Sequence, residues 1–353
     1  MANLTIAAGY PKALLDFAVS KGADRLTLLG RTGIHAEDLS QQDNRVPVSS
    51  YVELMKAAAQ LTNEPAIALQ FGEAVRMQDI SIVGLICEAC TTTIDVGRQL
   101  NRYASLVVDD GVEPATLLRA VSKDGGVWIQ GPSDLLTDNP LIAEAEFARL
   151  VWNARVMFKS SPEFQKLRFP RVMHFMHAEP SYRDEHERVF QAPVIFGSHW
   201  NAMLIDAEFL SLKQPPVNRY VFGVLSERAD AMLKSLQQSK TTRGRVESLL
   251  MAILHTGEAD MDAIADKLGV SRRKLYRQLK AEGVTFERVL DELRHRLALH
   301  FLSGKKVSVN ETAYLVGFSD PAAFSRAFKR WTGASPSAAR SPRATPLNAE
   351  SAG

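Results

Sequence analysis

The spacing of apolar residues in the first two thirds of the chain changes repeatedly between a helical and a strand-like pattern. Apolar residues lie three or four positions apart over residues 13–29, which predicts a helix that Gly30 ends. Further helices are predicted over 49–61, 65–75, 94–106, 139–159 and 182–190. Strands are predicted over 115–122, 127–129, 169–176, 194–196 and 202–205, with a hairpin turn at 123–126. This mixture predicts an α+β domain.

The last third of the chain shows only helical patterns. Pro215 and Pro216 precede a helix expected to run to about residue 236, and the polar stretch after it breaks the pattern. The final residues are rich in Ser, Ala and Pro, a composition typical of disordered ends. We therefore predict an α+β domain over 1–236, a linker over 237–244, an all-α domain over 245–340 and a disordered tail over 341–353.

Charge is distributed unevenly between these two parts. A 46% hydrophobic and 23% charged composition is typical of a globular protein and excludes a disordered or collagen-like chain. The formal net charge of +2 would by itself argue against a nucleic-acid-binding protein. However, residues 240–353 hold 19 Lys and Arg against 12 Asp and Glu, a net charge of +7, and the rest of the chain has a net charge of −5. The near-neutral total is therefore the sum of an acidic body and a basic C-terminal third.

Targeting signals and reactive cysteines are not apparent. The N-terminus lacks a basic region followed by an apolar core, and no apolar stretch approaches the ~20 residues needed to cross a bilayer. We expect a cytoplasmic protein that contacts no membrane. Cys87 and Cys90 have the spacing of a redox or zinc pair, but zinc would need two further ligands and no second such pair exists. Buried structural cysteines are favoured, and any other role of this pair stays open.

Two histidines near one another in the sequence could suggest a metal site. His174 and His177 flank a predicted strand end, with Glu179 nearby. Residues three apart on a strand point to opposite faces, so shared metal ligation by this pair is not expected. The sequence predicts no metal site, no cofactor and no catalytic residue.

The strongest local pattern lies at residues 260–279, which match the spacing of a helix-turn-helix. With Met261 as the first position of the motif, Ala265, Gly269 and Leu275 occupy its fifth, ninth and fifteenth positions. A small residue allows the two helices to cross closely, a glycine permits the turn, and a leucine fills the space between the helices. Ser271 is predicted to cap the second helix.

The second helix of this motif has an apolar and a basic side. At 100° per residue, its two leucines lie together. The opposite side carries Arg273, Tyr276, Arg277 and Lys280, next to Arg272 in the first turn. Arginine can form paired hydrogen bonds with guanine in a major groove, and phosphates attract the remaining charges. The alternative is an ordinary solvated basic helix, which is what most runs of charge are.

A second unit repeats the pattern further along the chain. Ala313, Gly317 and Phe324 recur with one extra residue between the glycine and the core residue. Asp320 is predicted to cap the last helix of this unit, with Pro321 in its first turn. The outward positions of that helix are Ala322, Arg326 and Lys329. A long helix predicted over 286–302 joins the two units, which could place two helices in successive major grooves about 34 Å apart.

Taken together, residues 260–340 resemble the DNA-binding domain of AraC/XylS-family transcription regulators. The first half matches at Ile264-Ala265, Leu268-Gly269, Ser271-Arg272-Arg273, Leu275, Arg277, Leu279, Gly283 and Thr285-Phe286. The second half matches at Gly317-Phe318-Ser319-Asp320, Phe324-Ser325-Arg326, Phe328-Lys329, Gly333 and Ser335-Pro336. Thr312 replaces a usual branched aliphatic residue and Ala339 a common tyrosine, and both positions concern packing.

The resemblance also implies which positions read bases. They are Arg273, Tyr276 and Arg277 in the first recognition helix, and Pro321, Ala322 and Arg326 in the second. An alanine can offer only an apolar contact to a thymine methyl group. We therefore expect the first helix to set most of the sequence specificity and the second mainly to position the domain.

Residues 182–212 resemble the arabinose-binding-type sensor domain of one branch of this family, which includes regulators of ornithine utilisation. The matching residues are Tyr182, Phe190, Pro193-Val194, Phe196-Gly197, Asn201, Leu204, Leu210 and Pro215. Gln191 departs from the glycine that usually follows this phenylalanine. The resemblance implies that residues 1–236 bind an effector and form dimers. It identifies neither a sugar ligand nor any effector-binding residue.

The leading hypothesis is a one-component transcription regulator that binds a double-stranded promoter or operator under control of a small molecule. A homodimer is expected from the family, and RNA polymerase would be a partner of an activator. An enzyme targeted to DNA is one alternative, but the chain lacks the P-loop, G-x-G-x-x-G, G-x-S-x-G and H-E-x-x-H motifs. An architectural DNA-binding protein without an effector is another. The effector, the operator and the choice between activation and repression stay open.

Overall fold

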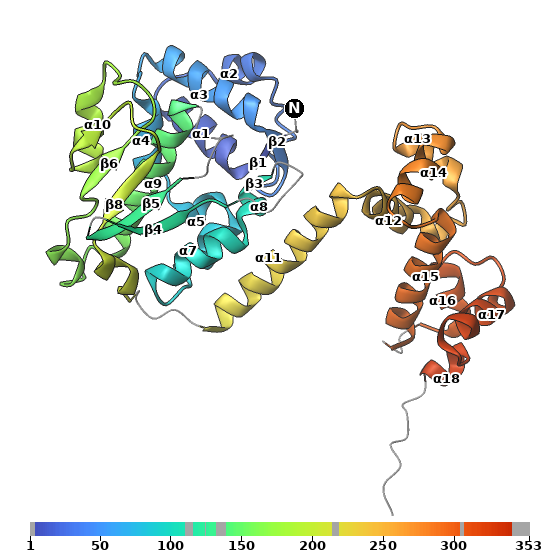
Figure 1. Cartoon of the computed structure of the whole chain (residues 1–353). Coiled ribbons are helices and arrows are strands. Elements are labelled where there is room, and N and C mark those ends of the chain that lie inside the picture. Colours follow the sequence, from blue (N-terminus) through green and yellow to red (C-terminus); the bar gives the residue numbers. More distant parts are fainter. Residues whose placement is uncertain are drawn as a thin grey trace, which may run out of the picture. The chain divides into compact units, whose positions relative to one another are not determined.

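A computed structural model describes residues 4–109, 116–123, 125–131, 139–213, 219–303 and 307–340 of the chain. Contacts between residues divide the chain into two compact units, Met1–Lys234 and Ser235–Gly353 (Figure 1), and each is described by itself. The tail predicted over 341–353 and the Pro215-Pro216 pair lie outside the described residues.

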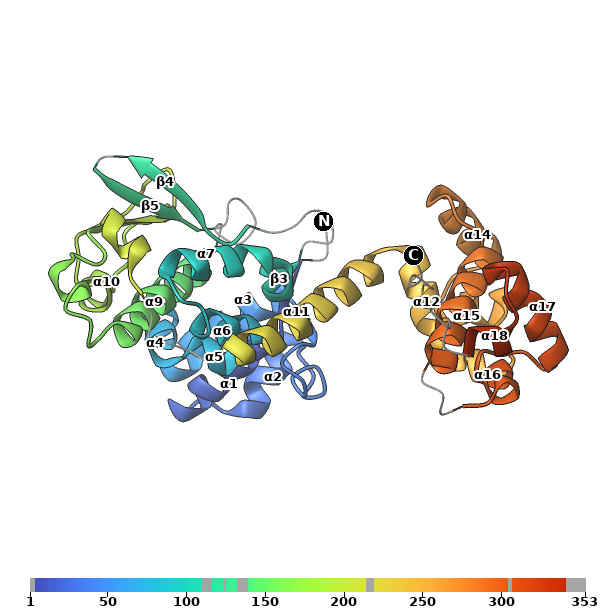
Figure 2. The same cartoon turned by 90° about the horizontal axis from the view of Figure 1, so that it is seen from below.

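The first unit contains two small sheets. A three-stranded antiparallel sheet has the order β2-β1-β3, with β1 at Thr5–Ala7, β2 at Arg45–Pro47 and β3 at Val108–Asp109. A five-stranded sheet has the order β4-β5-β8-β6-β7, with β4 at Arg119–Lys123, β5 at Gly126–Gln130, β6 at Val172–His174, β7 at Val194–Ile195 and β8 at Ala202–Ile205. In the larger sheet β6 and β7 pair in parallel, and the other described pairs are antiparallel. The β4–β5 hairpin forms one edge of this sheet (Figure 2).

Helices surround these sheets. They are α1 (Gly9–Ser20), α2 (Arg25–Thr32), α3 (Val48–Thr62), α4 (Ile67–Ala74), α5 (Met77–Ile80), α6 (Ile82–Glu88), α7 (Thr93–Arg102), α8 (Ala104–Val107), α9 (Pro140–Met157) and α10 (Arg183–Phe190), with 3-10 turns η1 (Phe164–Lys166) and η2 (Ala207–Ser211). The apolar side of α9 packs on the larger sheet, where Phe147 and Phe175 are buried together. Gly72 lets α4 approach α9, since a Cβ there would lie 2.5 Å from that of Ala148. The predicted α+β fold is confirmed.

Two expectations for the first unit were wrong in detail. The helix predicted over 13–29 is two helices, α1 and α2, separated by a turn in which Gly22 has a φ of +99° and Asp24 caps α2. Gly30 lies inside α2, and Gly33 ends it. The strands β1, β2 and β3 were missed because strands of two or three residues are too short to show an alternating pattern.

Most residues in the range predicted as a linker, 237–244, are helical. Helix α11 runs over Arg219–Lys240, and α12 begins at Thr242 and ends at Ile253. Thr241 alone separates them, and its hydroxyl accepts a hydrogen bond from the N–H of Gly244 at 2.9 Å. The reason is that Gln, Ser and Lys are tolerated in helices, and the stretch has no glycine or proline before its last residue.

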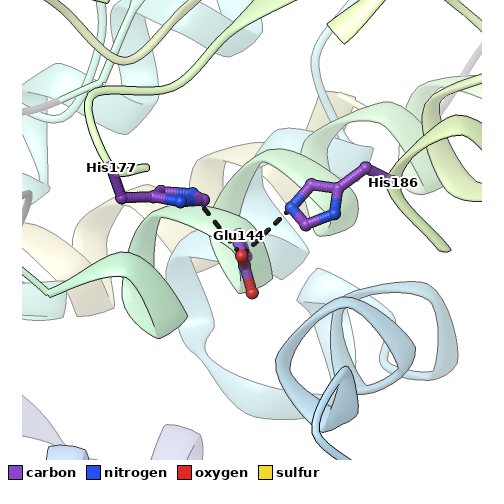
Figure 3. Close-up of side chains that lie close together, drawn as sticks. All are labelled: Glu144, His177 and His186. Carbon is purple, nitrogen blue, oxygen red and sulfur yellow. Dashed lines mark hydrogen bonds and ion pairs between the residues drawn. The ribbon is translucent and has the colours of Figure 1, made fainter. Parts of the chain in front are cut away.

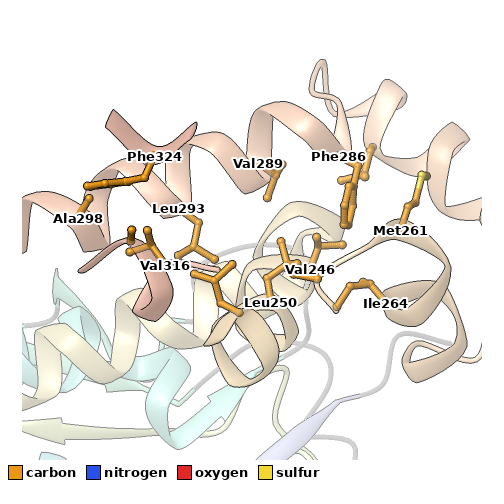
Figure 4. Close-up of a cluster of buried hydrophobic side chains, with 14 of the residues drawn as sticks. Val246, Leu250, Met261, Ile264, Phe286, Val289, Leu293, Ala298, Val316 and Phe324 are labelled. Carbon is orange, nitrogen blue, oxygen red and sulfur yellow. The ribbon is translucent and has the colours of Figure 1, made fainter. Parts of the chain in front are cut away.

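The second unit is entirely helical in its described part. Beyond α12 it contains η3 (Leu254–Thr256), α13 (Met261–Lys267), α14 (Arg272–Ala281), α15 (Phe286–Ser303), α16 (Val309–Leu315), α17 (Pro321–Thr332) and α18 (Pro336–Arg340). One hydrophobic cluster runs through all of it. Figure 4 shows Met261 and Ile264 beside Phe286 at one end of α15, and Phe324 beside Ala298 towards the other. Because α15 contributes to both ends, the two helix-turn-helix units share one core.

Candidate DNA-binding interface

The first helix-turn-helix consists of α13 and α14, and the predicted motif residues occupy the expected places. Ala265 is buried where the two helices meet, and Gly269 has a φ of +65° in the turn between them. A positive φ is costly for residues with a Cβ, which explains the glycine. The Ser271 hydroxyl caps α14 by accepting a hydrogen bond from the N–H of Lys274 at 3.3 Å.

The outward side of α14 is basic. Leu275 and Leu279 are fully buried, and Tyr276 on the other side is 52% exposed. The exposed cationic residues of this side are Arg273, Arg277 and Lys280. Within the described part of the chain, none of these three side chains forms a hydrogen bond or ion pair. Arg272 differs from them, since its guanidinium pairs with the carboxylate of Asp262 on α13.

The second helix-turn-helix consists of α16 and α17. Ser308 and Glu311 form a reciprocal capping box at the start of α16. The carboxylate of Asp320 caps α17 by accepting hydrogen bonds from the N–H groups of Ala322 and Ala323 at 2.9 and 3.0 Å. Pro321 is the first residue of α17, as predicted.

The outward side of α17 carries fewer groups that can bind DNA. Phe324 and Phe328 are buried, and the exposed residues predicted to face outward are Ala322, Arg326 and Lys329. The guanidinium of Arg326 lies 3.9 Å from the carboxylate of Asp320, a loose and exposed pair. The structure therefore exposes most of the predicted DNA-contacting residues on α14 and α17; Pro321 alone is half-buried.

An arginine that the sequence did not single out holds the turn between α16 and α17. Arg294 on α15 donates hydrogen bonds to the carbonyl oxygens of Val316 and Gly317 at 3.1 and 3.0 Å. Its guanidinium also lies 4.6 Å from the ring centre of Phe318, within cation–π range. These contacts join residues 22 and 23 positions apart, so no local sequence pattern could have revealed them.

A second long-range contact connects α12 to the end of α14. The carboxylate of Glu282 accepts hydrogen bonds from the N–H groups of Thr242 and Arg243 at 2.6 and 2.9 Å. Although partial burial opposes ionisation, these hydrogen bonds hold the pKa of Glu282 below its ordinary value. A carboxylate at a helix N-terminus also interacts favourably with the helix dipole. The first turn of α12 is thereby fixed to the recognition helix.

Two domain profiles match this chain. The one described as the arabinose-binding domain of AraC transcription regulator, N-term, matches residues 22–214, and the one described as a helix-turn-helix domain matches residues 264–341. The chain belongs to the AraC family of transcription regulators. The resemblance found in the sequence is thereby confirmed in both domains, and this AraC-family chain is a DNA-binding regulator with an N-terminal ligand-binding domain.

Relatives along the whole chain are transcription regulators and not enzymes. The ornithine utilization regulator of Pseudomonas aeruginosa is 26% identical over 329 residues, covering 93% of this chain and 94% of that protein. The HTH-type transcriptional regulator VirS of Mycobacterium tuberculosis is 24% identical over 332 residues, covering 91% and 92%. The transcriptional activator RhaS of Escherichia coli is 40% identical over 100 residues, 27% of this chain and 36% of RhaS. The solved structure of the regulator CdpR from P. aeruginosa aligns over 89% of this chain and 96% of its own, at 21% identity and a TM-score of 0.38.

The arabinose-binding-type domain of this AraC-family chain contains a cavity of about 310 Å³. Its walls come from α6, α7, α9, η2 and the strands β4, β5 and β8. Most of the lining is apolar, including Ile94, Leu100, Leu150, Met157, Phe209 and Met203. No sequence pattern marked this cavity, because its walls come from segments spread over more than a hundred residues.

The polar side chains at the cavity are already engaged by the protein. The amide of Asn101 makes hydrogen bonds of 2.7–3.1 Å with the backbone of Leu117 and Leu118, and that of Asn153 makes them with backbone at 2.8 and 3.2 Å. The hydroxyl of Thr93 donates to a backbone carbonyl of η2. Glu88 and Arg98 lie at the rim, and each pairs with a neighbouring residue. The cavity therefore presents an apolar interior.

The two cysteines of the first unit are buried. Cys87 and Cys90 are each 3% exposed, which confirms that they are buried. Burial raises the pKa of both thiols, that of Cys90 to about 11, so neither is an ionised nucleophile at neutral pH.

Among the helices that the structure describes, none combines the length and apolar character that crossing a membrane requires.

Proposed function

We propose that this AraC-family regulator binds double-stranded promoter or operator DNA through α14 and α17, placed in two successive major grooves, and that a small molecule in the cavity controls this binding. The observation that carries the proposal is the exposed basic side of α14, where Arg273 and Arg277 have no competing partner among the described residues. A side chain positioned by a packed helix loses less freedom on binding than one on a loop. The same proposal includes homodimerisation, action in the cytoplasm, contact with RNA polymerase during activation and the lack of enzyme activity.

Arg272 joins this interface at small cost. Its pair with Asp262 leaves the two side chains 61% and 63% exposed. Exposed pairs of this kind contribute only about 0–1 kcal/mol. Arg272 can therefore exchange Asp262 for a DNA phosphate with little loss.

Substitution of Arg273 is expected to reduce sequence discrimination more than substitution of Arg326. Loss of a paired contact to guanine costs roughly 1–3 kcal/mol for the preferred base, about a 5- to 150-fold loss of affinity. Arg273→Ala and Arg326→Ala are compared by titrating a selected DNA site and a panel of its single-base variants. Arg330→Ala is the matched control, because this exposed arginine of α17 pairs with Asp291 on α15 at 3.0 Å. A greater loss of sequence discrimination in Arg326→Ala would refute the proposal that α14 sets most of the sequence specificity.

The cavity supports an apolar effector. With its amides and hydroxyl committed to backbone groups, it has no buried charge to anchor a strongly polar ligand. Transfer of an apolar ligand from water contributes about 25 cal/mol for each Å² buried, which favours binding without such an anchor. We infer an effector that is chiefly hydrocarbon, aliphatic or aromatic.

Helix α7, which lines the cavity, also contacts α11, the helix that precedes the DNA-binding unit in the sequence. At the end of α7, Arg102 donates two hydrogen bonds of 3.0 Å to the carboxylate of Asp230 on α11. The hydroxyl of Tyr103 donates to the same carboxylate at 2.9 Å. A ligand that displaces α7 would therefore change the contacts of α11, which is the differential interaction that control requires.

Asp230→Asn is expected to uncouple the cavity from α11 while leaving the fold intact. The Arg102–Asp230 pair is about half exposed, so its loss should cost less than about 1 kcal/mol of stability. Hydrogen exchange of α11 is measured with and without Nile red, a neutral apolar dye, as the cavity ligand. The dye should change exchange in the wild-type chain and not in Asp230→Asn. Asp16→Asn, which removes the exposed pair with Arg25 elsewhere in the domain, should behave as wild type.

A thermal-shift screen of apolar metabolites tests the function as a whole. A true effector should raise the unfolding temperature, be recovered chemically unchanged, and alter affinity for a selected DNA site. Conversion of the bound compound would indicate an enzyme. Stabilisation with unaltered DNA affinity would contradict effector control.

A further inference from the structure

A carboxylate in the first unit is buried between two histidines. Glu144 on α9 and His186 on α10 have fully buried side chains, and His177, which follows β6, has a side chain only 12% exposed. Figure 3 shows both imidazoles directed at the carboxylate, with Nε2 of His186 3.0 Å and Nε2 of His177 3.5 Å from Oε1 of Glu144. Among the described residues, this is the one group of three such side chains whose ligand atoms all lie within 4.8 Å of one another.

The carboxylate of Glu144 forms no ion pair with an arginine or lysine within the described part of the chain. Its further partner is the hydroxyl of Tyr182, 3.1 and 3.2 Å from the two carboxylate oxygens. Removing a carboxylate from water costs several kcal/mol unless a positive charge accompanies it.

Both imidazoles turn Nε2 towards this carboxylate. Nδ1 of His177 lies 2.9 Å from the carbonyl oxygen of Ala178, and Nδ1 of His186 lies 3.4 Å from that of Tyr182. A carbonyl only accepts hydrogen bonds, so Nδ1 is the donor in each contact, and Nε2 is the ring atom that faces Glu144. Nε2 of His177 is buried and makes no hydrogen bond in the described structure. Two imidazole nitrogens and a carboxylate oxygen, each able to bind a metal ion, thus converge on one point and lie within 4.8 Å of one another.

We propose that Glu144, His177 and His186 bind a divalent transition-metal ion, most suitably Zn²⁺. Two imidazole nitrogens and one carboxylate oxygen form a known zinc ligand set that leaves one coordination position open. Histidine ligands of metals commonly donate the other ring N–H to a backbone carbonyl, the arrangement present here at both residues. The Tyr182 hydroxyl orients the carboxylate in the same way.

His174 and His177, which are close together in the sequence, do not form this site as a pair. His174 does not belong to this group, and its Nδ1 lies 2.9 Å from the hydroxyl oxygen of Ser198. The partners of His177 come from α9 and α10 instead. An ion there would join three separate segments, one of which, α9, also walls the apolar cavity.

Rings around the three side chains exclude water and so strengthen ion binding. The ring centres of Phe175 and Phe196 lie 5.0–5.5 Å from those of the two histidines. The guanidinium of Arg183 lies 6.0 Å from the ring centre of Phe196 and pairs with Glu179 and Glu187. Electrostatic attraction is larger in such an apolar surrounding than in water.

The test uses the full-length chain stripped with a chelator and titrated with Zn²⁺ against a chromophoric chelator. One equivalent of Zn²⁺ should bind, and free Zn²⁺ at about 100 times its dissociation constant should raise the unfolding temperature by roughly 5–10 °C. His177→Gln should lower Zn²⁺ affinity at least about 100-fold, since loss of a direct ligand exceeds the 10- to 100-fold effect of an outer-shell change. Glu144→Gln should also lower it, and Co²⁺ in the wild-type chain should show a tetrahedral absorption spectrum.

Two control variants separate this site from other metal ligands. His174→Gln removes a half-buried histidine of the same domain, and Cys87→Ser tests the buried cysteine pair. Both should bind Zn²⁺ as the wild type does. His177 is partly exposed and follows strand β6, so its substitution should not prevent folding. The unfolding temperature of His177→Gln without metal checks this. Absence of tight Zn²⁺ binding, binding unaffected by His177→Gln, or binding lost in Cys87→Ser would each overturn the proposal, and none of these outcomes bears on DNA binding.

Discussion

Gly317→Ala is expected to unfold the DNA-binding unit at temperatures at which the wild-type unit is folded. Gly317 lies in the turn before α17 with a φ of +77°, and a Cβ there would lie 2.4 Å from the carbonyl oxygen of Leu254. The left-handed backbone costs alanine about 1–2 kcal/mol, and the contact with a fixed backbone oxygen adds roughly 1–3 kcal/mol. For a unit of this size, the unfolding temperature should fall by roughly 10–25 °C. Far-UV circular dichroism during heating measures it, and DNA affinity should fall with the folded fraction.

Gly333→Ala is the matched control for this prediction. Gly333 ends α17 with a φ of +75°, but a Cβ at this position would meet nothing within 4 Å. It should therefore lose only the backbone contribution of about 1–2 kcal/mol. Equal losses in the two variants would show that the close approach of Gly317 to the carbonyl oxygen of Leu254 contributes nothing to stability, and would contradict this prediction.

Gly97→Phe is expected to abolish ligand binding in the cavity without weakening the fold. Gly97 lies on α7, lines the cavity, and would place a new Cβ in open space. A non-glycine residue is favoured inside a helix by up to about 1 kcal/mol, so the variant should fold at least as well as the wild type. A phenyl ring should fill a large share of the 310 Å³ space. Nile red, titrated by fluorescence, should bind at least about tenfold more weakly, a loss of about 1.4 kcal/mol or more.

The control for this variant is Gly30→Phe. Gly30 is also a helical glycine whose Cβ would meet nothing within 4 Å, but it lies on α2 and does not line the cavity. Dye affinity should be that of the wild type. Unchanged affinity in Gly97→Phe, or an equal loss in Gly30→Phe, would show that the dye binds elsewhere and would remove the support for an apolar effector site.

Features that depend on local spacing were predictable from the sequence. Gly269, Ser271 and Asp320 each act within a few residues of their own position, so residue type and spacing sufficed to place the turns and helix caps of both helix-turn-helix units. The exposed face of α14 followed from helical periodicity alone. The helix expected to end at about residue 236 continues to Lys240, because the polar residues there fit a helix as well as a coil.

Features made by distant segments were not predictable. Arg294 acts on a turn 22 residues away, and Glu282 on a helix start 40 residues away. Glu144 and His186 are 42 residues apart in the sequence and meet only in the folded domain. The cavity likewise has no local signature. In each case the contact depends on how distant segments pack together. The spacing of residues in a single sequence does not reveal that packing.

Selection of binding sites by the full-length chain from a pool of random double-stranded DNA, followed by footprinting of the selected site, tests the central claim most directly. If α14 and α17 enter successive major grooves, the selected sites should contain two blocks of preferred bases about 10–10.5 base pairs apart, each protected on its major-groove side. Arg273→Ala should relax the preference within one block and leave the spacing unchanged. A single block of preferred bases, or no selection above random sequence, would contradict the account.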